Sequence, residues 1–362
     1  MGIYKKLLIE IKLEILLYLM YNYLMKGCLK RLSGKEQLSF DEIREVVGKI
    51  ANKEVSDAQI GAFIMGLTNK GVSKEEFYAL AKSMRDYAIR VKSDKYIVDS
   101  CGTGADMSKS INISTTASIV ANAAGANVIK QTNSSITSTC GSTDFLSALN
   151  IDINRTTEKA LEFFNRNYIT FVHSPYFNEF AKINNPIRQQ LGIKSVFNYL
   201  GPLINASFPD AQLLGVSSNE MLEKTAYALQ KLETDRALIV NGLNPNLDEL
   251  SICSETRVLE LKNGKIEEYI IKPEDFGFQR AELSEIQGGN GVDNARLITE
   301  IFNGKRKDAM KNVISMNAGA MIYLAGIKPT LYEGIKYAEK VIENGLAAKK
   351  LLSLQGKEAV NV

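Results

Sequence analysis

Small polar residues and glycine cluster at 99–106 (DSCGTGAD), where the chain passes from an expected strand toward an expected helix. Gly102 and Gly104 allow a sharp turn that leaves backbone N–H groups exposed. The segment 112–115 (NIST) then supplies amide and hydroxyl groups at a helix start, where free N–H groups attract anions. These residue types in this order indicate a phosphate-binding site.

Two further polar loops and a carboxylate pair extend this pattern. Lys130 opens the loop KQTNSS and could hold a phosphate by its charge, while 139–143 (TCGST), which contains Ser142, precedes an expected helix and could hold a second phosphate. Asp248 and Glu249 are adjacent carboxylates, and hard oxygen ligands of this kind bind Mg²⁺ beside a polyphosphate. The sequence therefore predicts a ligand with more than one anionic group, bound with Mg²⁺ at the carboxyl ends of strands.

Composition excludes several other classes of function. The 362-residue chain has 44 Lys and Arg, 41 Asp and Glu and a formal net charge of +3, which argues against a dedicated nucleic-acid binder. His173 is the only histidine, so a His-rich metal site is excluded and a Ser-His-Asp triad has little room. The cysteines Cys28, Cys101, Cys140 and Cys253 include no CxxC pair, and we expect them to be reduced and the protein to be cytoplasmic.

The first part of the chain is expected to be helical. Ser39, Ser56 and Ser73 each precede an apolar helical pattern, and Gly71 is placed to end the second helix. No strand pattern separates these helices, so residues 26–95 are predicted to form a small all-helical domain.

Beyond residue 95, apolar runs alternate with helical patterns, which is typical of an α/β sheet covered by helices. Asn263 and Gly264 lie between two strand patterns and predict a hairpin, so the sheet is expected to be mixed and mostly parallel. Strands are expected at 96–99, 126–130, 169–172, 211–216, 237–240, 250–253, 258–262 and 269–271. Helices are expected at 115–124, 142–149, 157–165, 219–232, 291–303, 306–325 and 330–353.

The amino-terminal residues form a separate pattern. Residues 3–24 are strongly apolar, but lysines and glutamates interrupt the run, so no membrane span is predicted. No small-residue cleavage site follows, which argues against a signal peptide. We expect an apolar helical extension that serves packing or subunit contacts; membrane-surface binding and a true start at Met25 are the alternatives. The predicted domains are 1–25, 26–95 and an α/β domain over 96–362.

Together these motifs resemble the anthranilate phosphoribosyltransferase family over roughly residues 26–353. The resemblance implies a fold of the nucleoside phosphorylase/phosphoribosyltransferase type, in which a small helical domain forms a homodimer and joins a larger α/β domain. Part of 186–200 would return to the helical domain. The segments that carry the resemblance are 99–106, 112–118 (NISTTAS), 141–146 (GSTDFL), 186–206 (PIRQQLGIKSVFNYLGPLINA), 256–277 (TRVLELKNGKIEEYIIKPEDFG), 288–297 (GGNGVDNARL) and the pair Asp248 and Glu249.

The resemblance implies transfer of 5-phosphoribosyl from phosphoribosyl pyrophosphate (PRPP) to the amine of anthranilate, with release of pyrophosphate, as a step of tryptophan biosynthesis. Ribose C1 would develop oxocarbenium character as pyrophosphate leaves, and Mg²⁺ would neutralise the departing charge. An aromatic amine is neutral at pH 7, so no acid or base residue is required. The protein would act by positioning and electrostatic stabilisation.

The resemblance also implies roles for individual residues. Asn133 and Arg188 would position the acceptor, and the Arg188 guanidinium suits a carboxylate through a bidentate pair. The implied metal ligands are Ser114, Asp248 and Glu249. The implied substrate-binding residues are Gly102, Thr103, Gly104, Asp106, Asn112, Ser114, Thr115, Lys130, Asn133, Ser142 and Arg188.

The chain departs from the family pattern mainly on the acceptor side. The donor and metal half is better preserved, so the acceptor could differ from anthranilate or PRPP could bind weakly. The departing positions are Gln131, Thr132 and Ser134, where the family usually has His, Gly and Arg; Asn178 and Lys182, where it tends to have His and Arg; and Asn241 and Ala105, which replace a His and a Gly.

Two alternatives to an anthranilate phosphoribosyltransferase stay open. One is a related transferase or phosphorylase with another aromatic or nucleobase acceptor, because 132–138 (TNSSITS) is similar to the Ser-rich loop of the related nucleoside phosphorylases, although 256–277 favours the transferases. The other is a non-catalytic binding paralogue, including nucleic-acid-binding relatives, which the modest charge and the intact carboxylate pair disfavour. The expected partners are PRPP and an aromatic amine, with no nucleic acid and no membrane.

Overall fold

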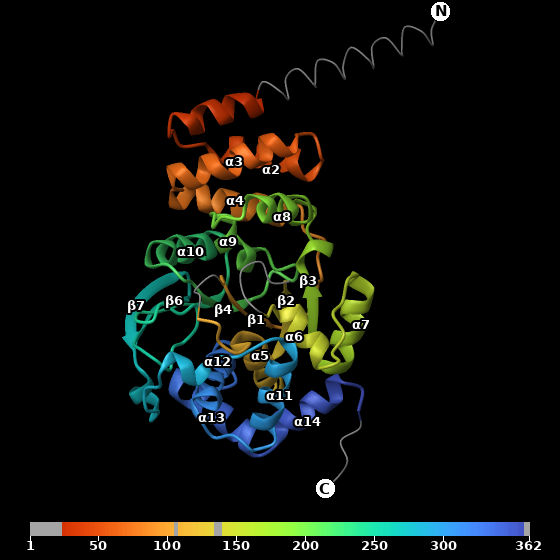
Figure 1. Ribbon diagram of the computed structural model, residues 1–362, viewed down its shortest axis with the longest axis vertical. Coiled ribbons are helices and arrows are strands. Elements are labelled where there is room, and N and C mark those ends of the chain that lie inside the picture. The colour runs from red at the N-terminus through yellow and green to blue at the C-terminus, as the bar shows by residue number, and fades with distance from the viewer. Residues whose placement is uncertain (1–23, 105–107, 134–139, 358–362) are drawn as a thin grey trace, which may run out of the picture.

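A group of helices lies at one end of the molecule, and a sheet with its own helices fills the rest, as the computed structural model shows (Figure 1). The structure describes residues 24–104, 108–133 and 140–357. Most of the predicted amino-terminal extension, as well as Ala105, Asp106 and Ser134, therefore lies outside the described residues. Across these residues no helix combines the length and apolarity that a membrane crossing requires. The predicted fold class, a small helical part joined to a larger α/β part, is confirmed.

The helical end is built from local signals that the sequence carries. Ser39, Ser56 and Ser73 each accept a hydrogen bond from the backbone N–H three residues on, and each start is a complete capping box. This confirms the three predicted starts. The helices are residues 24–33, α2 (Phe40–Ala51), α3 (Asp57–Lys70) and α4 (Lys74–Asp86).

Seven strands form one sheet in the order β3-β2-β1-β4-β5-β6-β7. The first five are parallel, and β6 and β7 join antiparallel through the predicted hairpin at Asn263 and Gly264. The sheet is therefore mixed and mostly parallel, as predicted. The strands are β1 (Ile97–Gly102), β2 (Asn127–Thr132), β3 (Ile169–His173), β4 (Ala211–Gly215), β5 (Arg236–Gly242), β6 (Thr256–Lys262) and β7 (Lys265–Ile271).

The remaining elements follow the predicted pattern with four differences, the first being that the short helix α9 (Phe197–Leu200) was not predicted. Helix α8 was not predicted, because Pro186 interrupts its pattern. The predicted helix at 330–353 is two helices, since Gly345 adopts a left-handed conformation (φ +70°) between them. The strand predicted at 250–253 is an irregular loop. The helices are α5 (Ile113–Ala123), α6 (Ser142–Ala148), α7 (Thr157–Asn167), α8 (Glu179–Leu191), α9 (Phe197–Leu200), α10 (Asn219–Lys231), α11 (Gly291–Phe302), α12 (Ala309–Leu324), α13 (Leu331–Glu343) and α14 (Leu346–Leu354).

Both faces of the sheet are buried, which explains why its parallel strands are continuous apolar runs. Helices α5 and α12 cover one face, and Leu213 and Leu238 point into the core there. On the other face Leu214 and Ile239 share one apolar cluster with α10, with α8 and with the amino-terminal helices. Helix α8 also packs against α2 and α3. The domain boundaries predicted at residues 25 and 95 stay a proposal, but the two parts share a core.

Buried polar groups fix the middle of β1 and of β2 against the segment that follows α9. The Asn205 amide donates to Asp99 Oδ2 at 2.7 Å and to the Ile129 carbonyl at 2.8 Å. Asp99 is completely buried, and its Oδ1 has no partner among the described residues. Burial raises the pKa of Asp99 to about 6, although nearby Lys130 and the Asn205 amide act in the opposite direction.

We predict that Asp99 makes the stability of the fold depend on pH. Its folded pKa lies above the unfolded value, so its contribution is fully present below about pH 4 and is lost as the pH rises through about 6. We therefore expect urea unfolding to show that the free energy of unfolding of Asp99→Asn, relative to that of the wild type, rises by roughly 3 kcal/mol between pH 4 and pH 7. Asp94→Asn, at an exposed position, is the control. Parallel pH profiles for Asp99→Asn and the wild type would contradict the prediction.

Candidate active site

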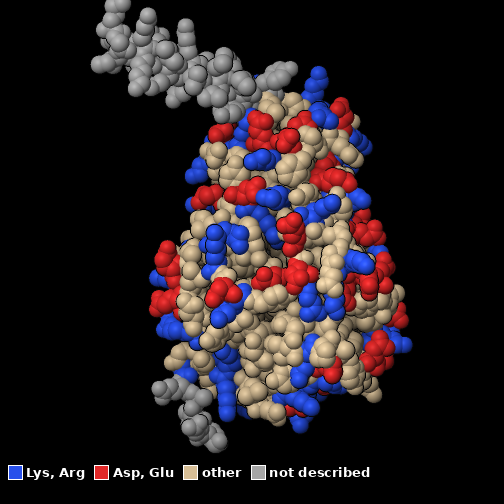
Figure 2. All heavy atoms as spheres, turned by 180° about the vertical axis from the view of Figure 1, so that it is seen from behind, with Lys and Arg blue, Asp and Glu red and all other residues tan. Residues whose placement is uncertain are grey.

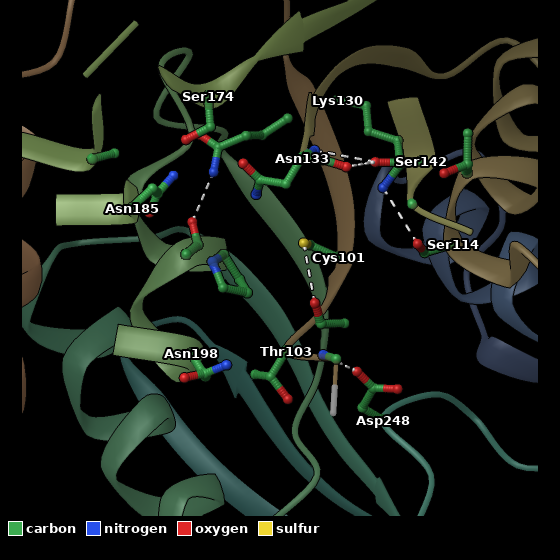
Figure 3. Close-up of a pocket in the computed structure, with 18 of the residues that line it drawn as sticks. Cys101, Thr103, Ser114, Lys130, Asn133, Ser142, Ser174, Asn185, Asn198 and Asp248 are labelled. Carbon is green, nitrogen blue, oxygen red and sulfur yellow. Dashed lines mark hydrogen bonds between the residues drawn. The ribbon is translucent and has the colours of Figure 1, made fainter. Parts of the chain in front are cut away.

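A cavity of about 480 Å³ opens at the carboxyl ends of β1 and β2, with α8 and residues 197–204 on its opposite side (Figure 3). It brings together almost all the residues predicted from separate loops. Asp106 is the exception, because it lies outside the described residues. The predicted residues that line the cavity are Gly102, Thr103, Gly104, Asn112, Ser114, Thr115, Lys130, Asn133, Ser142, Arg188, Asp248 and Glu249.

The first loop is held in place by the end of β4 and by the loop that carries the carboxylate pair. Thr103 donates its backbone N–H to the Gly215 carbonyl at 3.0 Å, and its hydroxyl accepts from the Ser217 N–H at 3.1 Å. The Gly104 N–H donates to the Asp248 side chain, and Gly104 has a left-handed φ of +70° (Figure 3). The predicted backbone turn therefore lies at Gly104, where it faces a carboxylate, whereas Gly102 is the last residue of β1 and pairs with Gly215.

Two glycines permit the close approach of Asp248 to the sheet. A Cβ added at Gly102 would lie 2.4 Å from Asp248 Oδ2, and one added at Gly215 would lie 1.5 Å from the Asp248 carbonyl oxygen. No side chain fits at either position without moving the loop. Asn317 fixes the same loop from below, since its side chain bonds both the N–H and the carbonyl of Leu250 at 3.0 Å. Side-chain partners of this kind satisfy the backbone at 250–253, where a strand was predicted.

The carboxylate pair suits a hard divalent cation. Asp248 and Glu249 are 7% and 8% exposed and both line the cavity, as does the Ser114 hydroxyl. In the described part of the chain, no three His, Cys, Asp or Glu side chains gather as a metal site. Two carboxylates and a hydroxyl, completed by water and substrate phosphate oxygens, are the kind of ligand set that Mg²⁺ takes. The residues present therefore fit Mg²⁺.

The ammonium group of Lys130 is buried in the wall of the cavity. Lys130 is 2% exposed, and its Nζ donates to the Ser100 carbonyl and to Ser114 Oγ, the latter at 3.4 Å (Figure 3). It makes no ion pair with any described residue, so its charge is available to an anionic ligand. Thr115, at the start of α5, is 1% exposed and its hydroxyl has no partner among the described residues. Both groups are suited to phosphate oxygens.

Hydrogen bonds join the second and third predicted loops to the start of α5. Asn112 is the N-cap residue of α5, and its side chain donates to Cys140 Sγ at 3.4 Å. The Ser142 hydroxyl bonds both backbone groups of Asn133 at 3.2 Å. Asn294, on α11, accepts from the Asn112 N–H at 3.0 Å. The three loops are therefore one connected surface.

Arg188 lines the cavity from α8. Its Nη1 donates to Asn185 Oδ1 at 3.2 Å, whereas its buried Nε has no partner among the described residues. Burial lowers the pKa of Arg188 to about 10, so the side chain stays charged at neutral pH. A guanidinium with an unmet donor in a cavity is suited to a carboxylate ligand.

Titratable chemistry at the cavity is sparse, as the composition indicated. Burial and the nearby Arg155 charge lower the pKa of His173, which lines the wall and lies 3.4 Å from the Thr143 hydroxyl. Burial raises the pKa of Cys101 to about 12 and also raises that of Cys140, so both thiols are protonated at neutral pH. The groups are therefore suited to positioning a ligand and not to nucleophilic catalysis.

The structure separates the departures from the family pattern into two kinds. Gln131 and Lys182 line the cavity, and the Gln131 amide donates to the Gly201 carbonyl at 2.9 Å. Asn178 does not line it, because its side chain caps α8 and donates to the Met84 carbonyl at 2.8 Å.

Two further departures also serve the fold. Thr132 is fully buried and bonds the Val172 carbonyl at 3.1 Å. The Asn241 amide donates to the Val216 carbonyl at 2.6 Å and to Asn246 Oδ1 at 2.8 Å. These two residues lie outside the cavity lining.

Helix α8 also supplies cavity residues that sequence reasoning missed, namely Asn184, Asn185 and Gln189. A local signal for this helix was present. Asn178 is a favourable N-cap residue, and Gly192 ends the helix in a left-handed conformation.

Comparisons with known proteins identify the same family. Residues 26–88 match a family described as "Glycosyl transferase family, helical bundle domain", and residues 94–348 match "Glycosyl transferase family, a/b domain". The chain is 37% identical over 332 residues to the anthranilate phosphoribosyltransferase of Thermoanaerobacter sp. (strain X514), covering 91% of this chain and 98% of the relative. It is 38% identical to that of Haloarcula marismortui, covering 92% of this chain and 100% of the relative.

Solved structures agree with these relatives. The crystal structure of anthranilate phosphoribosyltransferase from Thermus thermophilus is similar with a TM-score of 0.84 and 33% identity, covering 91% of this chain and 98% of that chain. The Saccharomyces cerevisiae enzyme in complex with PRPP and Mg is similar with a TM-score of 0.83 and 25% identity, covering 92% of this chain and 97% of that one. The predicted family is confirmed: the chain belongs to the anthranilate phosphoribosyltransferases.

Proposed function

We propose that this chain transfers the 5-phosphoribosyl group of PRPP to the amine of anthranilate and releases pyrophosphate, a step of tryptophan biosynthesis. The observation that carries the proposal is one cavity in which the three polar loops and a buried carboxylate pair face a guanidinium on α8. The family supports it, since its members bear this activity in their names and one of them binds PRPP and Mg.

The donor would occupy the side of the cavity next to the sheet. Gly102, Thr103 and Gly104 would surround the ribose and pyrophosphate, together with Asp106. The start of α5, with Asn112, Ser114 and Thr115, would hold phosphate oxygens. Lys130 would neutralise pyrophosphate charge from its buried position, and Ser142 would bind phosphate at the third loop. Support comes from the unpartnered Thr115 hydroxyl and from the Lys130 ammonium, which makes no ion pair with described residues.

Asp248, Glu249 and Ser114 would hold Mg²⁺, which supplies positive charge for the departing pyrophosphate. The protein orients the remaining groups. Asn133 and Arg188 would position the acceptor, with the guanidinium on its carboxylate. The amine nitrogen then forms a bond to ribose C1 while the C1–O bond breaks, pyrophosphate takes that electron pair, and the amine loses one proton to water or pyrophosphate. No base residue is needed, because a neutral aromatic amine has a free lone pair.

A second candidate is the same transfer to another aromatic amine or a nucleobase. It is favoured by amide groups on two walls of the cavity: Gln131 lines it from β2, and Asn185 and Gln189 line it from α8 together with Lys182. A nucleic-acid substrate is not proposed. On the face in Figure 2, basic and acidic side chains are interspersed, without the broad basic field that nucleic acids require.

We further propose a homodimer formed through the helical end, and a cytoplasmic location. Phe40 is 38% exposed at the start of α2 and packs against Tyr78 with ring centroids 5.8 Å apart. The two rings form an exposed apolar surface on the helical end, which a second copy of the chain could cover. The location is supported by the four cysteines, which are all free thiols.

Purified full-length protein should release pyrophosphate from PRPP only when anthranilate and Mg²⁺ are both present. Chelation with EDTA should stop turnover, and added Mg²⁺ should restore it. Pyrophosphate release, coupled to a colour reaction, measures this directly, with benzoate in place of anthranilate as the control for uncoupled hydrolysis. Turnover with a different aromatic amine or a nucleobase but not with anthranilate would replace the proposal with the second candidate.

Loss of either carboxylate should remove most of the activity. Asp248→Asn and Glu249→Gln should each lower kcat/KM for PRPP by about 100-fold or more, because each removes a charged oxygen ligand next to the departing pyrophosphate. Glu255→Gln, in the same loop but half-exposed, is the matched control and should keep its activity. Full activity in both cavity variants would disprove the metal assignment.

An acidic residue at the start of α2 should break the proposed dimer. Phe40→Asp places an unpaired charge on the exposed apolar surface, while an acid in the first turn of a helix does not harm the helix itself. Analytical ultracentrifugation should show twice the chain mass for wild type and the single chain mass for the variant. Tyr332→Asp, at the exposed start of α13, is the control and should remain dimeric. A dimer that survives Phe40→Asp would place the interface elsewhere.

A further inference from the structure

One buried amide in the cavity has no role in the site as described above. Asn184, on α8, lines the cavity and is 1% exposed. Its side chain forms no hydrogen bond with any described residue, and its Oδ1 is fully buried without a partner. Exchanging the two amide atoms would bury an unmet NH₂ in its place, so one polar atom stays unsatisfied either way. An unsatisfied amide destabilises the fold, which makes it a candidate for ligand contact.

The position of Asn184 on α8 places it at the edge of the cavity. Phe180 and Ile187 lie on the face of α8 that packs into the apolar cluster shared with the helical end. Ala181 and Arg188 lie on the face that lines the cavity. Asn184 is between these two faces, one turn before Arg188. An apolar side chain would suit the packing there, so packing does not explain an amide.

Asn184 and Arg188 together present complementary unmet groups. Residues four apart on a helix are neighbours, with Cβ atoms about 5–6 Å apart. Asn184 Oδ1 is an acceptor that needs a donor, and Arg188 Nε is a donor that needs an acceptor. Asn185 already engages Arg188 Nη1 at 3.2 Å, which holds the guanidinium in place and leaves Nε for a ligand. A planar ligand with an N–H donor beside a carboxylate would meet both groups.

We propose that Asn184 is a specificity-determining residue of the acceptor site, which accepts a hydrogen bond from the acceptor's amine while Arg188 binds the adjacent carboxylate. The proposal rests on the acceptor half of the proposed function and narrows its substrate class to aromatic amines with an ortho carboxylate. One amine N–H given to Asn184 fixes the rotation of the amine and leaves its lone pair free. An acceptor without the N–H, or with the amine remote from the carboxylate, leaves Asn184 unsatisfied and binds more weakly.

The test compares two ligands on matched variants of the full-length protein. Anthranilate has the amine, and benzoate has the same ring and carboxylate without it. Asn184→Leu removes the acceptor atom at similar volume, and Asn184→Ala is a second variant in case leucine does not fit. Gln190→Ala changes an exposed residue of the same helix outside the cavity and is the control. Affinities for anthranilate and benzoate are measured by calorimetry with Mg²⁺ and pyrophosphate present, and KM and kcat are measured with PRPP.

We expect the Asn184 substitution to weaken the binding of anthranilate but not that of benzoate or PRPP. Asn184→Leu should weaken anthranilate binding about fivefold to tenfold, the usual effect of one neutral hydrogen bond. Benzoate affinity and the KM for PRPP should change by less than about twofold, because the carboxylate contact and the donor side are untouched. The melting temperature of Asn184→Leu should be equal to or above that of wild type, since an unmet buried amide has been removed.

Other outcomes separate the two proposals. Equal weakening of anthranilate and benzoate, or no weakening of either, would overturn the role of Asn184. If wild type shows no turnover but binds anthranilate more tightly than benzoate, and the Asn184 variants lose that preference, the inference stands and the proposed reaction fails. A wild type that binds benzoate as tightly as anthranilate would also overturn the inference, whatever its activity with PRPP.

Discussion

The site depends on the close passage of the Asp248 loop over the ends of β1 and β4. The Asp248 carbonyl occupies the space where a side chain of residue 215 would be, so the loop can lie there only because Gly215 has none. Gly102, on β1, likewise has no side chain where the Asp248 carboxylate lies. The contact sets the carboxylate against the Gly104 N–H, so the turn of the first loop and the place of the carboxylate fix each other. Asn317 anchors the loop from α12, which ties the position of the carboxylate to the core of the α/β part.

The donor side could be predicted from sequence because its signals are local. The polar loops lie in the two connections that run from β1 to α5 and from β2 to α6, and parallel strands place their carboxyl ends at one edge of the sheet. The carboxylate pair lies more than a hundred residues after these loops in the sequence. Only its residue types indicated that it serves the same ligand as the loops. The capped helices at the amino-terminal end were predicted for the same reason, since Ser39, Ser56 and Ser73 satisfy N–H groups within their own first turns.

The acceptor side could not be predicted to the same extent, because its residues depend on distant partners. Pro186 made α8 look like an irregular segment, so Asn184 and its neighbours were not placed in the cavity. Asn205 and Asn317 are single polar residues that bond backbone groups far away in the chain, and nothing near them in sequence indicates this. The loop at 250–253 has the composition of a buried strand, yet its backbone is satisfied by side chains and not by a neighbouring strand.

The fold divides the departures from the family pattern into residues that bond the backbone and residues that line the cavity. Asn178, Thr132 and Asn241 bond backbone carbonyl groups and lie outside the cavity lining, so their effect on an acceptor is indirect. Among the departures that the structure describes, Gln131 and Lys182 line the cavity. Any change in acceptor preference therefore has few side chains through which to act, and they lie on two facing walls: the end of β2 and helix α8.

The apolar cluster that the helical end shares with the sheet limits how the cavity can open. Leu214 and Ile239 of the sheet touch the same continuous core as residues of α2, α4 and α8. A rigid swing of the helical end away from the sheet would expose this core to water, at about 25 cal/mol for each Å² of apolar surface. Small sliding displacements of α8 and α9 keep the core covered and still change the width of the cavity. The wall proposed to select the acceptor therefore belongs to the part of the structure that can shift without exposing this core.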